Sequence, residues 1–324
     1  MNKISVAMTT YNGEKFLKEQ LDSIIKQSRQ IDELVVCDDG STDSTIKILN
    51  EFLNIAPFSM NIVINEKNLG STKNFEKAMS LCKNDIIILC DQDDVWLYDK
   101  VKVLENIFLM NQNCGMIFTN AVVIDEMNNT LNKLWFNYGF DKKKQNILKK
   151  GKGIELFIGN NIVTGATAAV RKSFFERTRP FPPELVHDHW LASIAVLERK
   201  LFFNDTITTN YRKHSMQQLG IGIPAINFSK RINKINNYNK IINSIQIMLN
   251  EFNYRFHLTQ EQRKMFTDKI EFYMFRKNLS SNYLICISGI IRNLFCGNYH
   301  KFASGLLSVA KDMKKILGGG CDKN

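Results

Sequence analysis

The sequence lacks the apolar stretches that mark membrane-spanning and secreted proteins. No run among its 324 residues approaches the ~18 consecutive apolar residues of a spanning helix. Residues 1–11 hold one lysine and an apolar stretch too short for the core of a signal peptide. Prolines are also few, at five, and 44% of the residues are hydrophobic, which is typical of a globular protein with a sizeable core. We therefore predict a cytoplasmic protein.

Paired cysteines and glycine-rich nucleotide motifs are missing as well. The seven cysteines are scattered, odd in number and without a Cys-x-x-Cys pair, which is typical of reduced thiols and not of a disulfide frame or a zinc site. The chain has no Gly-x-Gly-x-x-Gly after its first apolar run and no Gly-x-x-x-x-Gly-Lys-Ser/Thr. A dinucleotide-binding fold or a P-loop would need those glycines, so neither is expected.

The positive charge is unevenly distributed along the chain. The net charge is +11, and residues 225–324 contain 16 Lys and Arg against 6 Asp and Glu, a charge of +10. Residues 1–224 are therefore close to neutral. Such asymmetry indicates two regions with different partners. We predict a catalytic domain over residues 1–222 and a basic helical region over residues 223–324.

The first 110 residues alternate short apolar runs with segments of helical periodicity. Short continuous apolar runs predict buried strands, and apolar residues spaced three and four apart predict helices. Strands that alternate with helices in this way form a largely parallel α/β sheet flanked by helices. The predicted strands are 4–8, 33–37, 60–65 and 86–89, and the predicted helices are 14–27, a second ending near 52 and a third ending at 81.

Each predicted strand is followed by a polar cluster. The carboxyl ends of parallel strands meet at one edge of a sheet, and open α/β sheets bind their ligands there. We therefore expect one crevice lined by these clusters. They are Thr9-Thr10-Tyr11-Asn12, Asp38-Asp39-Gly40-Ser41, Asn68-Leu69-Gly70 and Asp91-Gln92-Asp93-Asp94.

The cluster at residues 91–94 places three carboxylates within four residues. Neighbouring carboxylates repel one another unless a cation or hydrogen-bond donors share them. Mg²⁺ and Mn²⁺ prefer carboxylate and phosphate oxygens, and Mg²⁺ usually takes one or two protein carboxylates and completes its shell with substrate phosphates and water. The cluster predicts a divalent metal beside a phosphate-containing ligand. The alternative is an acidic turn that caps a helix beginning near Asp99.

Two further residues fit a nucleotide at the same edge. Asp39 can accept a hydrogen bond from a pyrimidine N–H, and Tyr11 can stack on the base. The alternative for residues 38–41 is an ordinary turn followed by a helix cap. The alternative for Tyr11 is packing over the end of the sheet.

Four segments, in this order, resemble glycosyltransferase family 2. They read ISVAMTTYNGEKFLKEQLDSIIKQ, ELVVCDDGSTDST, NLGSTKNFEKA and CDQDDVW. The last is especially similar to the bacterial rhamnosyltransferase-like branch, and the resemblance covers about residues 3–222. It implies an inverting enzyme of the GT-A fold that uses a nucleotide-sugar donor, with a nucleotide-sugar half over about residues 1–110 and an acceptor half over about 111–222.

The resemblance also implies roles for individual residues. Thr9, Tyr11 and Asp39 match positions that bind the base and ribose, and a basic–Asn pair that lines the donor site matches residues 73–74. The two acids of the metal-binding DxD motif match Asp91 and Asp93, and Asp94 leaves the choice of pair open. The full set expected at the donor is Thr9, Tyr11, Asp39, Lys73, Asn74, Asp91 and Gln92.

The acceptor half holds one further catalytic candidate. Asp188 lies between two histidines at the start of an apolar helical stretch. A carboxylate in that setting can be tuned to act as a base, and the alternative is an N-cap aspartate. The resemblance implies that the catalytic base lies here, in a motif whose usual form is Glu-Asp, and His187 replaces the Glu. His214 matches a histidine that completes the metal or diphosphate site in related enzymes, and the alternative is a structural histidine.

Other parts of the acceptor half carry weaker signals. Residues 116–124 predict a strand, and the polar, lysine-rich segment 128–152 predicts a long loop or flap. Gly165 lies in a segment of small residues, 163–171, and permits close approach of a ligand. The alternative for that segment is a core strand beside a neighbour.

The last hundred residues predict basic helices over 237–252 and 260–279. Further on, an apolar stripe runs through a segment whose lysines lie mostly elsewhere. Such a helix can lie on an anionic membrane. The alternative is a helical subdomain packed on the catalytic domain. Nucleic acid is not expected, because no nucleic-acid motif accompanies the charge. The stripe consists of Phe302, Leu306, Val309, Met313, Ile316 and Leu317.

These observations predict an inverting glycosyltransferase with a Mg²⁺ or Mn²⁺ cofactor. It is expected to move a sugar from dTDP-rhamnose or a UDP-hexose to a saccharide acceptor of a bacterial surface polysaccharide. The basic C-terminus favours a lipid-linked acceptor and a peripheral position on the inner face of the plasma membrane. Asp188 is the predicted base, and the predicted metal ligands are Asp91, Asp93 and His214.

Two alternatives belong to other functional classes. A metal-dependent nucleotidyltransferase also uses acids at a sheet edge, but it needs a basic set that grips a triphosphate, and the N-terminal loops offer little beyond Lys67 and Lys73. A basic-tailed binding module without activity would release no nucleoside diphosphate from any activated sugar.

Overall fold

The computed structural model describes residues 3–215, 217, 231–279 and 283–317. The chain divides into two compact units, Met1–Ala225 and Ile226–Asn324. Each unit is described by itself below. The domain boundary predicted at residue 222 lies outside the described residues.

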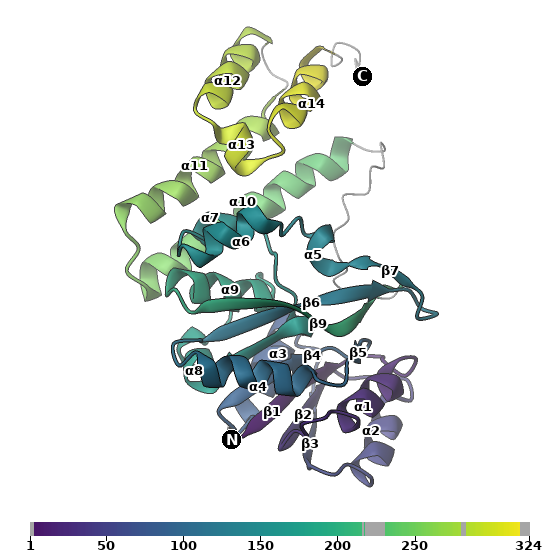
Figure 1. The fold of residues 1–324 in the computed structure, drawn as a ribbon. Helices are drawn as coiled ribbons and strands as arrows, with labels where there is room; N and C mark the ends of the chain where they lie inside the picture. Colours follow the sequence, from purple (N-terminus) through teal and green to yellow (C-terminus); the bar gives the residue numbers. More distant parts are fainter. Residues whose placement is uncertain (1–2, 216, 218–230, 280–282, 318–324) are drawn as a thin grey trace. The chain divides into compact units, whose positions relative to one another are not determined.

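In the described part of the first unit, nine strands form one sheet (Figure 1). Their order is β3-β2-β1-β4-β8-β6-β9-β5, and β7 pairs with β6. The strands are β1 (Ile4–Thr10), β2 (Glu33–Asp38), β3 (Ser59–Ile64), β4 (Ile86–Cys90), β5 (Val95–Trp96), β6 (Met116–Ile124), β7 (Thr130–Lys133), β8 (Ala168–Arg171) and β9 (Leu201–Arg212).

The sheet has a parallel half and a mixed half. Strand β1 pairs in parallel with both β2 and β4, and β2 pairs in parallel with β3. This is the parallel half predicted from the strand–helix alternation. Beyond β4 the order becomes mixed, because β8 lies antiparallel to both β4 and β6 while β6 and β9 are parallel. The change from parallel to mixed pairing begins at β8, which runs opposite to the strands on either side of it.

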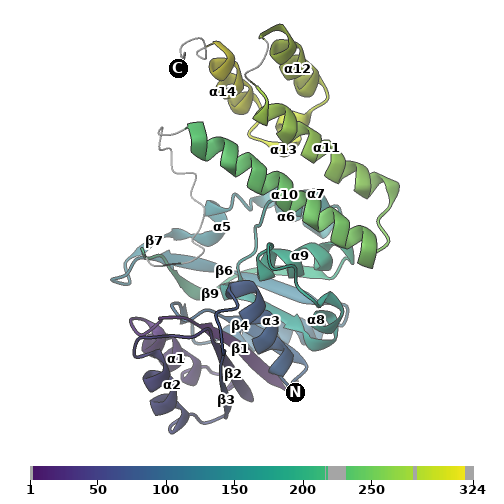
Figure 2. The ribbon, with the colours of Figure 1, turned by 180° about the vertical axis from the view of Figure 1, so that it is seen from behind.

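Helices cover both faces of the parallel half (Figures 1 and 2). Alternate residues of a strand point to opposite faces, so Val6 and Met8 of β1 face one layer of helices and Ala7 faces the other. The first layer is α1, α2 and α4, which share a core with the even-numbered residues of β1 and β4. Helix α3 packs on the other face, against β1 and β2. These helices are α1 (Leu17–Ile25), α2 (Thr45–Leu53), α3 (Ser71–Leu81) and α4 (Lys100–Met110).

The prediction of a long loop over residues 128–152 is wrong. The segment forms β7 and two short helices, α5 (Leu134–Asn137) and α6 (Lys142–Lys149). Leu134, Trp135 and Leu148 of this segment are buried. The Trp135 Nε1–H donates to the Thr119 carbonyl at 3.1 Å. Asp141 caps α6 by accepting from the Lys144 N–H at 2.9 Å. The many lysines of this segment suggested a solvated loop. Lysines are also frequent on the exposed face of a helix or strand whose other face is buried, so they do not distinguish the two cases.

The remaining elements of the first unit lead to the acceptor half of the predicted site. Gly165 opens a short 3₁₀ turn, not a strand, and only the residues from 168 onward join the sheet. These elements are α7 (Ile154–Phe157), the 3₁₀ turn η1 (Gly165–Thr167), α8 (Lys172–Thr178) and α9 (His187–Leu197).

The second unit is helical, as the basic C-terminal sequence predicts. Between residues 302 and 317 the predicted stripe is divided by a break at 303–305, and most of it faces inward. Val309, Met313 and Ile316 pack against a buried cluster that includes Phe272 and Tyr299. The stripe is therefore not a free membrane-facing surface, and Leu317 is not described at side-chain level. The helices are α10 (Arg231–Arg255), α11 (Gln260–Lys277), α12 (Tyr283–Phe295), α13 (Asn298–Phe302) and α14 (Leu306–Leu317).

Among the described residues, no helix has the length and apolar character needed to cross a bilayer.

Candidate active site

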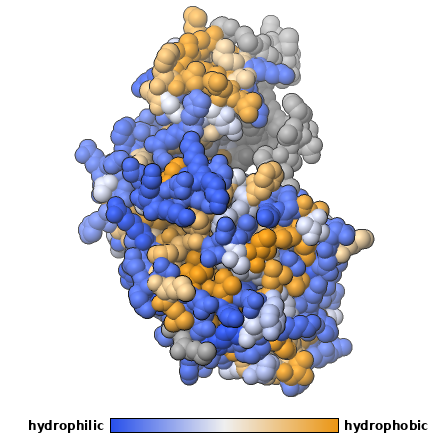
Figure 3. All heavy atoms as spheres, in the orientation of Figure 1, coloured by the Kyte–Doolittle hydropathy of each residue, from blue (hydrophilic) through white to orange (hydrophobic). Residues whose placement is uncertain are grey.

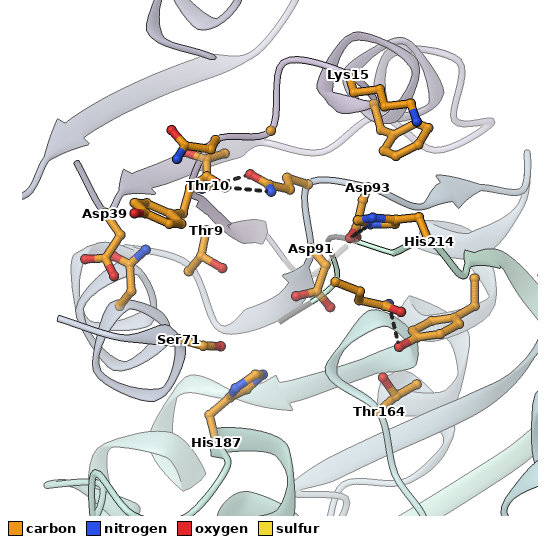
Figure 4. Close-up of a pocket in the computed structure, with 18 of the residues that line it drawn as sticks. Thr9, Thr10, Lys15, Asp39, Ser71, Asp91, Asp93, Thr164, His187 and His214 are labelled. Carbon is orange, nitrogen blue, oxygen red and sulfur yellow. Dashed lines mark hydrogen bonds and ion pairs between the residues drawn. The ribbon is translucent and has the colours of Figure 1, made fainter. Parts of the chain in front are cut away.

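A pocket of about 260 Å³ lies at the carboxyl edge of the parallel strands (Figure 4). Residues from the loops after β1 and β4, from α3, from the start of α9 and from the end of β9 line it. The fold thus brings together segments up to about two hundred residues apart. The predicted site residues that line this pocket are Thr9, Tyr11, Asp39, Asn74, Asp91, Gln92, Asp93, Asp188 and His214.

Lys73 is the predicted donor residue that lines a different hollow. That hollow adjoins the pocket and is formed by the start of α3 and residues 183–186. The Lys73 ammonium pairs with Glu76 at 2.7 Å on the same helix. Ser71, two residues earlier and not predicted from the sequence, lines both the main pocket and this hollow.

The acidic loop divides its three carboxylates between two tasks. Asp91 and Asp93 line the pocket, whereas Asp94 Oδ1 accepts from the backbone N–H of Arg212 at 2.9 Å. The acids do not cap the following helix, because β5 intervenes and Asp99 is the N-cap of α4. Asp91 and Asp93 are therefore the two acids of this loop that line the pocket.

Burial dominates the electrostatics of Asp91. Desolvation, with the adjacent charges of Asp93 and Asp188, raises the pKa of Asp91 to about 8, and Lys100 opposes that rise. The carboxyl of Asp91 therefore holds its proton near neutral pH until a cation favours the charged form.

Lys100 is a second residue that the sequence reading missed. Its side chain is fully buried, and its Nζ donates to the Ala166 carbonyl at 2.5 Å and to Thr209 Oγ1 at 2.9 Å. Burial lowers the pKa of Lys100 to about 8. The sequence signal was present, because Lys100 precedes Leu104 and Phe108 by four and eight residues and so shares their buried helix face.

His214 lies beside the pocket-facing acids. Its Nε2 is 2.8 Å from Asp93 Oδ2, and its ring centroid is 5.0 Å from that of Phe16 (Figure 4). Among the described residues, no three His, Cys, Asp or Glu side chains are placed to hold a metal ion by themselves. Two carboxylates that line one pocket nevertheless fit a hard divalent cation, because such a cation takes its remaining ligands from phosphates and water.

Arg212 holds the acidic loop through its backbone. Its guanidinium is fully buried and donates to the Asp93 carbonyl at 2.9 Å and to Glu19 Oε2 at 2.7 Å. It also donates to Asn128 Oδ1 at 2.7 Å. In the sequence nothing distinguishes Arg212 from Lys213, which is exposed, so only packing reveals its role.

Asp39 and Asn74 hold the donor side of the pocket in place. The Asp39 carboxylate accepts from Asn65 Nδ2 at 2.9 Å, from the Leu69 N–H at 2.7 Å and from the Gly70 N–H at 2.9 Å. Asn74 Nδ2 donates to the Cys37 carbonyl at 2.8 Å. These bonds fix the loop that leads into α3 against the end of β2.

Gln92 holds the loop after β1. Its Oε1 accepts from the Tyr11 N–H at 2.8 Å, and its Nε2 donates to the Tyr11 carbonyl at 3.0 Å. Gly13 makes room for this pairing, because a Cβ there would overlap Gln92 Oε1. Tyr11 is 38% exposed and lines the pocket.

Asp188 is the second residue of α9, and the N-cap is Val186. Its oxygens accept from Asn161 Nδ2 at 2.8 Å, from the Gly165 N–H at 2.9 Å and from the His189 N–H at 2.6 Å. Burial nevertheless raises the pKa of Asp188 to about 6, against the lowering effect of these bonds. Asn161 and Gly165, which hold the carboxylate, lie on a segment with little sequence signal.

Comparison with known proteins identifies the family. The model of glycosyl transferase family 2 matches residues 5–179. The dTDP-rhamnosyl transferase RfbG of Shigella flexneri is 30% identical over 251 residues, which cover 74% of this chain and 83% of RfbG. The chain belongs to glycosyltransferase family 2. The O-antigen chain rhamnosyltransferase RfbN of Salmonella typhimurium is 31% identical over 202 residues, 59% of this chain and 60% of RfbN.

A solved structure agrees with the fold. The mannosyltransferase PcManGT of Pyrobaculum calidifontis, in complex with GDP-Man and Mn2+, matches with a TM-score of 0.56 at 16% identity, over 99% of this chain and 88% of PcManGT. These comparisons confirm three predictions. They are the family, the GT-A-type fold with a helical C-terminal region, and the glycosyltransferase activity.

The contact between Gly13 and Gln92 predicts a measurable coupling. Gly13→Ala should displace the Gln92 amide and weaken binding of the donor nucleotide, because the loop after β1 loses two hydrogen bonds. Gln92→Ala should weaken it similarly, while the double variant should be no weaker than Gln92→Ala alone, since the overlap is gone. Calorimetric titration with nucleoside diphosphates measures all three. Additive losses in the double variant would contradict the contact.

Proposed function

We propose that this glycosyltransferase moves a sugar, with inversion, from a nucleoside-diphosphate sugar to a saccharide acceptor of a surface polysaccharide. The names of RfbG and RfbN make dTDP-rhamnose the favoured donor, with a UDP-hexose as the second choice. One observation carries the proposal: two acids suited to a cation and one buried carboxylate suited to proton transfer line the same pocket.

The lining does not favour a nucleotidyltransferase. Among the described residues that line the pocket, Lys15 is the single lysine or arginine, and its ammonium pairs with Glu126. A triphosphate needs more positive charge than this, whereas the diphosphate of a sugar donor is expected to share a divalent cation with the acids.

In the proposed reaction, Asp91 and Asp93 would hold a Mg²⁺ or Mn²⁺ ion, and His214, the third predicted ligand, lies 2.8 Å from Asp93. Such an ion would supply positive charge that neutralises the departing nucleoside diphosphate. Asp39, Asn74 and Gln92 keep the backbone of the donor side in place, and Thr9 and Tyr11 receive the base and ribose.

Asp188 acts as the general base. It removes the proton from an acceptor hydroxyl, whose oxygen forms a bond to the anomeric carbon of the donor sugar. The bond from that carbon to the diphosphate oxygen breaks on the opposite face, and its electron pair leaves with the nucleoside diphosphate. One displacement from the opposite face inverts the carbon. A pKa of about 6 leaves Asp188 ionised at neutral pH and still basic enough to accept a proton.

The donor and the metal are tested together. Nucleoside diphosphate release should appear with one donor of a panel in the presence of Mg²⁺ or Mn²⁺ and should disappear in EDTA. Asp91→Asn and Asp93→Asn should abolish most of it and weaken Mn²⁺ binding measured in the presence of nucleoside diphosphate. Asp94→Asn should retain Mn²⁺ affinity, because Asp94 faces the Arg212 backbone. Full turnover in EDTA would refute the metal, and no release from any donor would refute the enzyme activity.

The base is tested by its pH dependence. Asp188→Asn should lower turnover by about 10²–10⁴-fold while donor affinity changes little. In the wild type, turnover should fall as pH decreases through about 6, because the base becomes protonated. Asn161→Ala should move this fall to higher pH, since Asn161 stabilises the charged carboxylate. An unchanged pH profile in Asn161→Ala would place the base elsewhere.

The second unit supports peripheral membrane association through a surface other than the predicted stripe. Helix α12 is apolar on two faces: Cys286 and Ile290 are buried, whereas four other apolar side chains are exposed. A group of exposed apolar side chains of this kind is typical of a surface that binds a protein or a membrane. Figure 3 shows hydrophobic side chains gathered over α12. We define the α12 face as Leu284, Ile285, Ile291 and Phe295, and exposed Leu306 and Leu307 of α14 belong to the same unit.

Charge complementarity favours an anionic lipid surface as the occupant of the α12 face. In the described residues 284–316, the single acid is Asp312, which is buried and paired with Arg276 at 2.7 Å. The same residues carry five cations, so the solvated charge of this segment is entirely positive. Each Lys or Arg near an anionic membrane contributes ~1 kcal/mol of attraction. The five cations are Arg292, Lys301, Lys311, Lys314 and Lys315.

Liposome sedimentation separates the two contributions. Ile291→Ser combined with Phe295→Ser should reduce binding to anionic liposomes at every salt concentration, because it removes apolar contact area. Lys311→Glu combined with Lys314→Glu should reduce it mainly at low salt, since screening weakens surface charge. Met127→Ser, at an exposed site of the first unit, is the control and should bind normally. Wild type that fails to bind at low salt would overturn the proposal, and a dimer abolished by the Ser pair would assign the face to a second copy.

A further inference from the structure

His187 has an unusual environment for a buried histidine. It is the first residue of α9, it is 4% exposed, and it lines the pocket beside Asp188. Within the described residues, neither of its ring nitrogens has a hydrogen-bond partner. Buried polar atoms are nearly always paired, so each exception asks for an explanation.

The ring is held firmly in this position. It stacks on Phe75 of α3 with 3.8 Å between the ring centroids and an angle of 23°. On another side, Gly165 leaves space, because a Cβ there would come within 2.7 Å of Nε2. A histidine kept only to stack on Phe75 would bury two polar nitrogens without compensation, and phenylalanine would fill the same space without that cost.

The chemistry of the ring suits a hydroxyl group. Burial lowers the pKa of His187 to about 3, so the imidazole is neutral at physiological pH. One nitrogen of a neutral imidazole donates a hydrogen bond and the other accepts one. A sugar hydroxyl also donates and accepts, whereas a phosphate or carboxylate would favour a charged imidazole.

The position of His187 favours the donor sugar over the acceptor. In Figure 4 its ring points into the pocket below Asp91, with Ser71 on one side and Thr164 on the other. Ser71 lies toward Thr9 and Asp39, the residues assigned to the nucleotide. A sugar attached to a diphosphate near Asp91 would therefore lie in the part of the pocket that the His187 ring points into.

We propose that His187 hydrogen-bonds a ring hydroxyl of the transferred sugar and thereby helps to select the donor. The inference rests on the proposed donor role of this pocket. The subsite consists of His187 in the space kept by Gly165, with Phe75 behind the ring and Ser71 beside it. It accounts for the histidine at the position where related enzymes are expected to carry glutamate.

The test uses donor analogues in which each ring hydroxyl in turn is replaced by hydrogen, with hydrolysis followed in the absence of acceptor. His187→Phe keeps the stack on Phe75 and should lower kcat/KM for the parent donor by about 10- to 100-fold, the usual effect of one lost hydrogen bond in a buried site. For one deoxy analogue, the kcat/KM of the wild type should fall by the same factor relative to the parent donor. The kcat/KM of His187→Phe should be the same for that analogue as for the parent donor. His187→Gln, which can still donate and accept, should recover part of the activity.

His189→Phe is the matched control. His189 is also buried on α9, but its Nε2 lies 2.6 Å from the Phe157 carbonyl and it does not line the pocket. This variant should change thermal stability and leave the preference among analogues unchanged. Equal losses of His187→Phe across all analogues, with normal nucleoside diphosphate binding, would overturn the subsite. In a transfer assay, an effect of His187→Phe that disappeared only when an acceptor hydroxyl was removed would overturn the assignment to the donor. Wild type without hydrolysis of any donor would instead refute the proposed function itself.

Discussion

The first unit depends on three carboxylates packed at the end of one buried strand. Like charges at this spacing repel, and burial raises the cost of ionising them. Two buried cationic side chains, which the sequence pattern did not identify, lie near these carboxylates. Lys100 approaches from α4 and opposes the rise in the pKa of Asp91, and Arg212 approaches from β9 and binds the backbone at Asp93. With these supports the acidic loop keeps one shape, and two of its acids remain directed at the pocket.

Three of the residues predicted to touch the donor also hold the walls of the pocket. Asp39 fastens the loop before α3, Asn74 fastens α3 to the end of β2, and Gln92 fastens the loop after β1. Such bonds place backbone groups and the exposed Tyr11 ring before any ligand arrives, which reduces the ordering that binding would require. Most of the residues that family resemblance indicated therefore line the pocket, and the contacts of these three fix its walls.

The second unit shows how a helical pattern can mislead when its partner is unknown. The stripe at 302–317 has the spacing of a membrane-binding helix, yet Val309, Met313 and Ile316 pack against the unit's own aromatic core. The exposed apolar surface lies on α12, which has apolar side chains on its exposed side as well as on its buried side. The surface charge of the described residues 284–316 is positive, because their single acid, Asp312, is buried in an ion pair with Arg276.

Local sequence by itself determined the strand–helix alternation, the parallel half of the sheet and the edge at which the acids gather. These features follow from side-chain periodicity and from the direction of the strands, which involve residues close in the chain. Tertiary structure alone decided that Asp94 turns toward Arg212, that Lys100 lies beneath Asp91, and that His187 meets Phe75 but no polar partner among the described residues. Each of these contacts joins different elements of the fold, some more than a hundred residues apart in the chain, and no local pattern encodes which side chain will be left facing the pocket.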